Sequence, residues 1–290
     1  MELNEHSHII TCVDILGYKE VLKRNNKDEI DRIRTDFDYF VYNNAPIESN
    51  FPAFRCKSYT DNFLFYYKLD YNSHERKMHN IIRKLYGEKI DDVKQRIDRV
   101  LYLHIFNLAL AQFELINHNY FIRGGLTIGD FDPNGTIASG NGLYEAHELE
   151  EKATYPRIIL NQEVVREYIS RATPIPLLFD TDDNVVFIDF LSAYMRVYLN
   201  IQYVKNISKD EIENRNLEFF KSQLQSIRDN ILKNLKANSN GRVFEKYNWL
   251  AKYYDYFCYS YECFGLDSMA IEPRRDSYPF VIDLKSVLPE

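Results

Sequence analysis

Two aspartates, Asp14 and Asp61, occupy positions where carboxylates could hold a divalent cation. Asp14 ends the mostly apolar run 8–14, and Gly17 follows closely enough to allow a tight turn into a helix. Backbone N–H groups at such a helix N-terminus favour phosphate oxygens. The Asp14 carboxylate would repel a phosphate unless Mg²⁺ or Mn²⁺ bridged the two. Taken alone, Asp14 could equally be a cap of the following helix.

Asp61 strengthens the metal hypothesis because it lies in the polar tetrad 59–62 between two strand-like segments, a pattern that predicts a hairpin. In a β-α-β core such a hairpin commonly pairs with the first strand. The two carboxylates could then share one or two cations and stabilise in-line attack at phosphorus. The alternative is that Asp61 makes only an Asx hydrogen bond within the turn. Strand alternation puts Lys57 and Tyr59 on the face of Asp61, either inside the site or on its rim.

The elements that must position these residues follow from the spacing of apolar positions. The order β-α-β-β-α-β predicts an α+β fold with a ferredoxin-like core, in which helices lie on an antiparallel or mixed sheet. The predicted strands cover residues 8–14, 54–67 (two strands), 120–129, 136–139, 156–160 and 179–190 (a pair); the predicted helices cover 19–43, 91–117, 142–152 and 161–171, the last capped by Asn161.

The pattern changes near residue 191, so we expect two parts, 1–190 and 191–290. Residues 191–236 have helical periodicity, 242–263 form an aromatic-rich helix, and 278–284 suit a final strand. The second part is therefore predicted to be a mainly helical extension. Trp249 and its aromatic neighbours are expected to pack back onto the core.

The bulk composition excludes several functions. A formal net charge of −7 provides no global basic field for a nucleic acid, so an anionic substrate needs local cations or a metal. The polar residues 1–7 do not suit a signal peptide, and no segment approaches the roughly 20 apolar residues that span a bilayer. Cys12 and Cys56 suit reduced core thiols, and a cytoplasmic location is expected. The sequence contains neither a Walker loop nor a serine nucleophile elbow.

Four segments together resemble the class III nucleotidyl cyclases. Residues 14–18, Asp-Ile-Leu-Gly-Tyr, are similar to the Asp-Ile-x-Gly-Phe element of that family, and Asp61 matches its second metal-binding aspartate. Residues 123–129, Arg-Gly-Gly-Leu-Thr-Ile-Gly, resemble its Arg-x-Gly-Ile-His-x-Gly strand. Residues 140–149 stand where the family carries Gly-x-x-Val-Asn-x-Ala-x-Arg-Leu. The likeness spans roughly residues 8–160 and implies a class III cyclase core.

A closer resemblance is to the pyrimidine cyclases of the bacterial Pycsar antiphage systems. It is carried above all by residues 149–157, Leu-Glu-Glu-Lys-Ala-Thr-Tyr-Pro-Arg. The resemblance implies UTP or CTP as substrate, with UTP slightly favoured, and Mn²⁺ or Mg²⁺ as cofactor. The implied products are pyrophosphate and a 3′,5′-cyclic pyrimidine monophosphate, a second messenger for a downstream effector protein. It also implies a homodimer with sites formed across the interface.

The resemblance also implies roles for individual residues. Asp14 and Asp61 would bind the metals with the carbonyl of Ile15 as an extra ligand, and Arg123 would act in catalysis. The remaining candidates contact the substrate. The backbone of Leu16, Gly17 and Tyr18 would hold the β- and γ-phosphates, Lys57 and Tyr59 would read the base, and Arg157 would supply a further cation.

One departure from the family pattern concerns the helix after the glycine motif. Purine cyclases place a ribose-orienting Asn and a phosphate-stabilising Arg there, where this chain has Tyr144 and Glu148. Either Arg123 or Arg157 replaces that cation, or the domain binds a nucleotide without converting it. Each arginine could instead be held in a structural salt bridge. Lys57 occupies the position of a base-reading lysine in purine cyclases, so a purine substrate stays open, as does another two-metal phosphoryl-transfer activity such as a palm-like polymerase.

Overall fold

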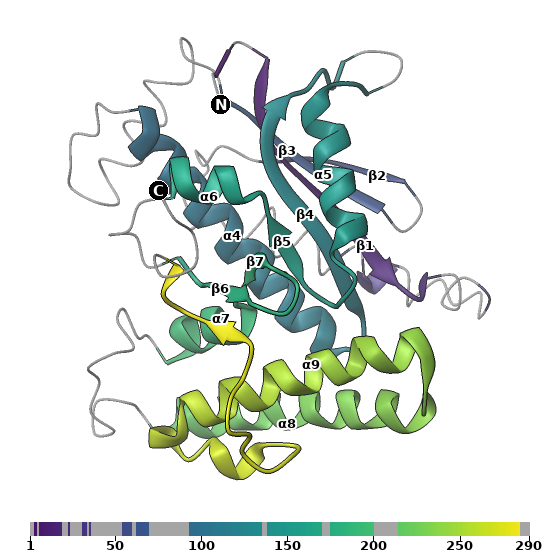
Figure 1. The fold of residues 1–290 in the computed structure, drawn as a ribbon, viewed down its shortest axis with the longest axis vertical. Coiled ribbons are helices and arrows are strands. Elements are labelled where there is room, and N and C mark those ends of the chain that lie inside the picture. Colours follow the sequence, from purple (N-terminus) through teal and green to yellow (C-terminus); the bar gives the residue numbers. More distant parts are fainter. Residues whose placement is uncertain are drawn as a thin grey trace.

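The computed structural model describes residues 3–4, 6–18, 23, 31–33, 35, 54–59, 62–69, 93–134, 138–169, 175–199 and 214–284. Within these ranges the chain forms one mixed sheet with helices on both faces (Figure 1). The predicted α+β class is therefore confirmed. Most of the predicted helix 19–43 lies outside the described ranges, as does Asp61.

Eight strands form the sheet in the order β2-β3-β1-β4-β5-β7-β6-β8, and only the β4–β5 pair among them is parallel. The predicted hairpin is confirmed as β2 and β3, which pairs with the first strand through β3. The strands are β1 (Ser7–Leu16), β2 (Arg55–Tyr59), β3 (Asn62–Lys68), β4 (Phe121–Asp130), β5 (Ile158–Leu160), β6 (Leu177–Asp180), β7 (Val185–Ile188) and β8 (Phe280–Val281).

Two predicted strands differ from the structure at their ends. The predicted pair 179–190 ends at Ile188, because the Asp189 side chain accepts a hydrogen bond from the Ser192 N–H and caps a helix. The short strand predicted at 136–139 is reduced to a single bridge between Asp132 and Ser139 in the part that is described. The helices are α4 (Val93–Asn117), α5 (Asn141–Lys152), α6 (Gln162–Tyr168), α7 (Phe190–Tyr198), α8 (Asn214–Ala237) and α9 (Gly241–Ser260), followed by short 3₁₀ turns at Glu262–Phe264 and Asp267–Met269.

Helix α4 is the central core helix and covers one face of the sheet. Its apolar residues recur at helical spacing, as predicted, and most are buried. His104 faces the sheet from α4, and its Nε2 lies 2.8 Å from Thr11 Oγ1. By length and composition α4 could cross a membrane, but 67% of its most apolar window is buried inside the protein, as in the core helix of a globular fold.

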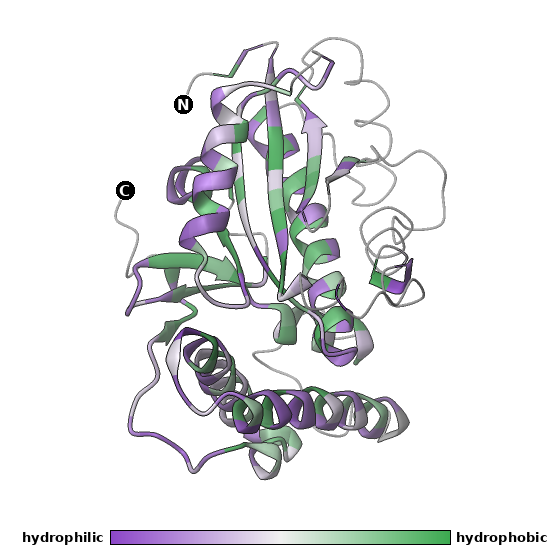
Figure 2. Cartoon of the chain, turned by 90° about the vertical axis from the view of Figure 1, so that its right-hand side faces the viewer, coloured by the Kyte–Doolittle hydropathy of each residue, from purple (hydrophilic) through white to green (hydrophobic). Residues whose placement is uncertain are grey.

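Helix α5 covers the opposite face, and Figure 2 shows the sheet between α4 and α5. A second, smaller apolar cluster lies there and includes Ile10, Cys12 and Ala146. The helix lies unusually close to β4 because glycines line the contact. A Cβ added to Gly125 would clash with Leu149 and come within 2.5 Å of the Ala146 carbonyl oxygen. This close approach fixes the distance between α5 and the strand that carries Arg123.

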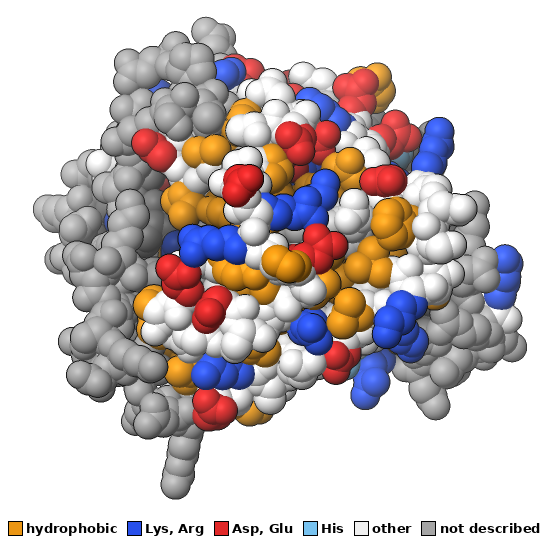
Figure 3. Space-filling view, turned by 60° about the horizontal axis from the view of Figure 1, so that its bottom comes forward, with side chains coloured by type: hydrophobic (Ala, Val, Ile, Leu, Met, Phe, Trp, Pro, Cys, Tyr) orange, Lys and Arg blue, Asp and Glu red, His pale blue; other side chains and the backbone are white. Residues whose placement is uncertain are grey.

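The C-terminal helices pack along one end of the sheet (Figure 1). Asn230 of α8 donates hydrogen bonds to the carbonyls of Ile116 and Asn117 and so satisfies the C-terminus of α4. Strand β8 returns to the core sheet and pairs with β6. Figure 3 shows acidic and basic side chains interleaved over this face, without one extended area of a single sign among the described residues.

Candidate functional site

The register of the sheet places the predicted site residues in one row. Asp14 of β1 lies opposite Asn62 of β3 on one side and opposite Arg123 of β4 on the other, and Asn62 lies opposite Tyr59 of β2. Because directly opposed residues share a face of the sheet, Asp14 and Arg123 project toward the same side as α5. Asp61 precedes Asn62 in sequence but lies outside the described residues, as does the Tyr59 side chain.

Asp14 and Arg123 form an ion pair near the surface. Arg123 Nε lies 3.1 Å from Asp14 Oδ2, and the two side chains are 24% and 16% exposed. The Arg123 Nη2 lies 2.8 Å from Oε1 of Glu150, a carboxylate of α5 that is only 2% exposed. The salt-bridged alternative for Arg123 is therefore present in the structure. The predicted contact of Arg123 with a substrate stays a prediction.

Glu150 is a site residue that the sequence prediction missed. Its other carboxylate oxygen lies 2.9 Å from His147 Nδ1, so the carboxylate joins Arg123 to His147. Burial raises the pKa of the Glu150 carboxyl, the Arg123 charge opposes that rise, and the Asp14 charge adds to it. A usable signal existed in the sequence. Gly142, Ala146 and Glu150 recur every four residues, which places a carboxylate on the small-residue face that α5 buries.

The turn after β1 has the predicted glycine geometry. Gly17 has φ +79°, a left-handed conformation that favours glycine, although an added Cβ would meet no atom within 4 Å. The side chains of Ile15 and Tyr18 are buried in the core, at 2% and 5% exposure. These residues can therefore offer a ligand chiefly their backbone groups, as the predicted roles require. Their contacts with a metal or phosphates remain predictions.

Lys57 faces the same side of the sheet as Asp14, one pleat further along its strand. Its Nζ donates a hydrogen bond to the Pro133 carbonyl at 2.6 Å, in the loop after β4. The structure therefore gives Lys57 a partner within the protein. The predicted role of Lys57 in reading a base stays a prediction. Its position on the same face of the sheet as Asp14 is the observation that supports it.

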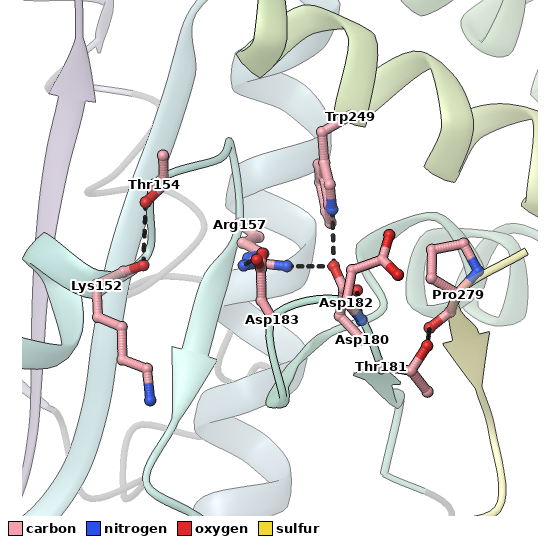
Figure 4. Close-up of polar contacts among 9 residues, drawn as sticks. All are labelled: Lys152, Thr154, Arg157, Asp180, Thr181, Asp182, Asp183, Trp249 and Pro279. Atoms are coloured by element: carbon pink, nitrogen blue, oxygen red, sulfur yellow. Dashed lines mark hydrogen bonds and ion pairs between the residues drawn. The ribbon is translucent and has the colours of Figure 1, made fainter. Parts of the chain in front are cut away.

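Arg157 lies in a different cluster, shown in Figure 4. Its side chain is 1% exposed, Nη1 lies 2.5 Å from Asp180 Oδ2, and Nη2 pairs with Asp183. The guanidinium also lies over the rings of Tyr155 and Trp249, at 4.9 and 5.0 Å from their centroids. Arg157 is thus held in a structural salt bridge, one of the two roles that the sequence left open. Two carboxylates already balance its charge, and within the described residues its contacts are with Asp180, Asp183 and neighbouring rings rather than with Asp14 or Glu150.

Tyr144 and Glu148 lie on the outer face of α5. The Tyr144 hydroxyl donates a hydrogen bond to Glu148 Oε1 at 2.6 Å, and the Tyr144 side chain is 66% exposed. The acceptor carboxylate raises the pKa of the Tyr144 hydroxyl. Neither side chain carries a positive charge, so neither could neutralise a phosphate.

The donors at the end of β1 suit a hard cation. The Asp14 carboxylate and the neighbouring Ile15 carbonyl are oxygen ligands of the kind that Mg²⁺ and Mn²⁺ accept. Within the described ranges, no group of three or more His, Cys, Asp and Glu side chains is placed to hold a metal ion. The Asp14 carboxylate therefore fits a metal ion by its chemistry, and Asp61, the second ligand predicted from the sequence, lies outside those ranges.

Comparison with known proteins gives a limited likeness. No protein-family model matches the chain, and no curated protein matches it. Among solved structures, the guanylyl cyclase Cya2 is 10% identical, with 64% of this chain and 92% of that chain covered and a TM-score of 0.35. The catalytic core of a rhodopsin-guanylyl cyclase with converted specificity, in complex with ATPalphaS, is 10% identical, with coverages of 63% and 96% and a TM-score of 0.36. Similarity at this level assigns neither an activity nor a substrate to this chain.

Proposed function

We propose that this chain is a nucleotidyl cyclase that converts a pyrimidine nucleoside triphosphate, UTP or CTP, to its 3′,5′-cyclic monophosphate and pyrophosphate. The observation that carries the proposal is the position of the Asp14 carboxylate. It stands at the end of β1, before the left-handed Gly17 turn, and in one sheet row with Arg123. A carboxylate, a backbone turn and a guanidinium are the groups that a metal-bound triphosphate requires.

Asp14, the Ile15 carbonyl and, by the sequence resemblance, Asp61 would hold Mn²⁺ or Mg²⁺. When bound, such a cation lowers the pKa of a hydroxyl and offsets the charge of phosphate oxygens. The metal would have to compete with Arg123 for Asp14, because the guanidinium contacts that carboxylate at 3.1 Å. Arg123 displaced in this way could offer its Nε–H and Nη1–H groups to the phosphates while Glu150 still holds Nη2.

The reaction itself needs positioning and charge stabilisation. The ribose 3′ oxygen forms a bond to the α-phosphorus and gives its proton to water, while the bond from the α-phosphorus to the pyrophosphate oxygen breaks and pyrophosphate leaves. Backbone groups of 16–18 would hold the β- and γ-phosphates, and Arg123 would offset the charge that develops on the leaving group. This arrangement requires no covalent intermediate with the protein.

The finer parts of the proposal come from the resemblance of residues 149–157. They are the pyrimidine base, a homodimer with sites at its interface, and a cyclic product that signals to an effector protein in antiphage defence. The outward position of Tyr144 and Glu148 on α5 is compatible with a partner subunit completing the site. Lys57 and Tyr59 remain the proposed base-reading residues.

A second candidate is a regulatory module that binds a nucleotide without converting it. The observation in its favour is the Tyr144–Glu148 pair, which occupies the helix positions where the purine cyclases carry Asn and Arg. A carboxylate there cannot stabilise a developing negative charge. The two candidates make opposite predictions about turnover.

The deciding experiment incubates the purified protein with each of the four nucleoside triphosphates and Mn²⁺, and measures pyrophosphate together with the nucleotide products. We expect a cyclic pyrimidine monophosphate and pyrophosphate in equal amounts.

The Asp14→Asn variant should lose turnover by roughly a hundredfold or more, because an amide is a poor ligand for a hard cation. Asp229→Asn, on the exposed side of α8, is the matched control and should retain activity. Nucleotide binding without pyrophosphate release would favour the second candidate, and linear products would indicate polymerase-type chemistry.

A further inference from the structure

Helix α9 of the C-terminal extension reaches the strand ends that carry Asp14 and Arg123. The Tyr247 ring packs edge-on against Phe121 at the start of β4, with ring centroids 4.9 Å apart. Phe121 lies opposite Leu16, the residue between Ile15 and the Gly17 turn. Figure 1 shows α9 passing beneath these strands. The first half of α9 therefore lies beside the candidate site.

Lys246 lies on the face of α9 that packs against the sheet. It is one helical turn before Trp249, whose Nε1 donates a hydrogen bond to Asp180 at 2.8 Å, and residues three apart share a helix face. The Lys246 side chain is half-buried. Burial lowers the pKa of its ammonium, the Arg123 charge lowers it further, and the Asp14 charge raises it. Lys246 thus lies within electrostatic reach of the pair at the end of β1 and β4.

No hydrogen bond or ion pair joins Lys246 to another side chain among the described residues. Two buried or partly buried guanidinium groups of the core differ in this respect. Arg123 has Asp14 and Glu150, and Arg157 has Asp180 and Asp183. A half-buried ammonium beside a second cation is costly without an anionic partner. Its position suits an anion that arrives with the ligand.

We propose that Lys246 binds the triphosphate of the nucleotide, so that the C-terminal extension supplies the cation that α5, with Glu148, does not supply. The inference rests on the proposed function in one respect, which is that the ligand is a metal-bound nucleoside triphosphate. Lys246 and Arg123 would contact phosphate oxygens from α9 and β4, on either side of the Gly17 turn. The second part of the chain would then be a component of the site as well as a packing element.

The test compares Lys246→Met, Lys246→Arg and a control, Lys252→Met on the same helix, with the unmodified protein. Calorimetric titration measures binding of Mn²⁺ alone, of Mn²⁺-pyrophosphate, and of a non-cyclisable α,β-methylene analogue of UTP with Mn²⁺. Lys246→Met should weaken pyrophosphate and analogue binding by roughly tenfold to a hundredfold, the scale of one charge-assisted contact. It should bind Mn²⁺ alone as well as or better than the unmodified protein, because a cation within electrostatic reach of Asp14 has been removed. Lys246→Arg should restore most of the phosphate affinity, and Lys252→Met should change neither.

The thermal midpoint separates a binding role from a structural one. The thermal midpoint of Lys246→Met should equal or exceed that of the unmodified protein. If Lys246 were needed for folding, the substitution would lower both the thermal midpoint and the affinity for Mn²⁺. Unchanged pyrophosphate and analogue affinity in Lys246→Met would overturn the inference and leave the proposed function in place. If the unmodified protein binds neither probe, both proposals fail. If it binds the probes in a Lys246-dependent way but releases no cyclic product, the Lys246 assignment stands and the cyclase proposal is wrong.

Discussion

The ion pair between Asp14 and Arg123 changes how the candidate metal ligand is understood. A carboxylate at the surface end of a strand would ordinarily be solvated, but here a guanidinium contacts it at 3.1 Å and is itself held by the buried Glu150. The pair orients the Asp14 carboxylate. It also raises the free energy needed to bind a cation at Asp14, because the cation must compete with a charge-assisted contact. A divalent ion can do so where a monovalent ion would do so poorly.

His104 gives the clearest pH prediction at the scale of a residue. It is 1% exposed, and its ring stacks on Phe54 with centroids 3.7 Å apart. Burial lowers its pKa from 6.5 to about 3. Below about pH 6.5 the unfolded chain therefore binds a proton at this histidine that the folded protein does not bind. The free energy of unfolding should fall as the pH drops from about 6.5 toward 3. The slope from this group is up to about 1.4 kcal/mol per pH unit.

Urea titrations between pH 6.5 and 4 measure this slope. His104→Asn should be less stable at pH 7, since the packing is altered, but its stability should depend less on pH in that range. His118→Gln is the matched control because His118 is exposed, and it should keep the slope of the unmodified protein. Equal slopes for His104→Asn and the unmodified protein would show that His104 does not titrate differently in the fold.

Asp14 could be singled out from the sequence as a candidate metal ligand, a role that stays a prediction, but its contact with Arg123 could not be foreseen. Carboxylate type, the glycine turn and strand alternation are local features, so they are visible along the chain. The Arg123 contact depends on the register between β1 and β4, which are 109 residues apart at the contact. The Lys246 position depends on how α9 docks. For Arg157 the sequence left a ligand contact and a structural salt bridge both open, because a Pro-Arg segment looks the same whether its charge faces a ligand or the buried Asp180.

At the scale of elements, Gly125 fixes the distance between β4 and α5. A Cβ at this position would clash with Leu149 and come within 2.6 Å of the Glu150 N–H nitrogen. Gly125→Ala should push α5 outward, lower stability by about 1–3 kcal/mol, and weaken metal-nucleotide binding because Glu150 would no longer hold Arg123. Calorimetric titration together with urea unfolding measures the two effects.

Gly124→Ala is the matched comparison for this prediction. Its added Cβ would approach the Cys12 carbonyl oxygen to 2.7 Å and the Val13 side chain to 3.1 Å, away from α5. Gly124→Ala should therefore also reduce stability. For the same loss of stability, it should weaken metal-nucleotide binding less than Gly125→Ala does. Equal loss of binding in both variants would mean that general destabilisation, rather than the position of α5, controls the site.

The elements themselves were predictable where periodicity was strong. The helix at 93–117 and the strands at 7–16 and 121–130 have long, regular patterns, and the structure has them within a few residues of the predicted ends. Errors arose where a single side chain decides a boundary, as when Asp189 caps α7 and ends the strand before it. The order of strands in the sheet, with β8 beside β6, depends on contacts between residues about 100 apart and has no local signal.

At the scale of the whole molecule, the contacts around Trp249 decide whether residues 191–290 behave as a separate unit. Trp249 lies on α9, stacks on Tyr155 with ring centroids 5.4 Å apart, and donates a hydrogen bond to Asp180 of the core sheet. Asp180 also pairs with the buried Arg157. These contacts tie the extension to the core through a buried charge, so the two parts should unfold together.

The single tryptophan makes this prediction measurable. Urea unfolding followed by Trp249 fluorescence and by far-ultraviolet circular dichroism should give one midpoint, as expected of a cooperative unit. Asp180→Asn should lower both midpoints together, by about 3–5 kcal/mol in unfolding free energy, because it leaves the Arg157 charge buried with one carboxylate fewer. Asp183→Asn should cost less, because Asp183 is 35% exposed and water can replace it. A fluorescence transition that precedes the dichroism transition would instead make the extension an independent domain. In that case the Lys246 contact with the site would depend on how firmly that domain is docked.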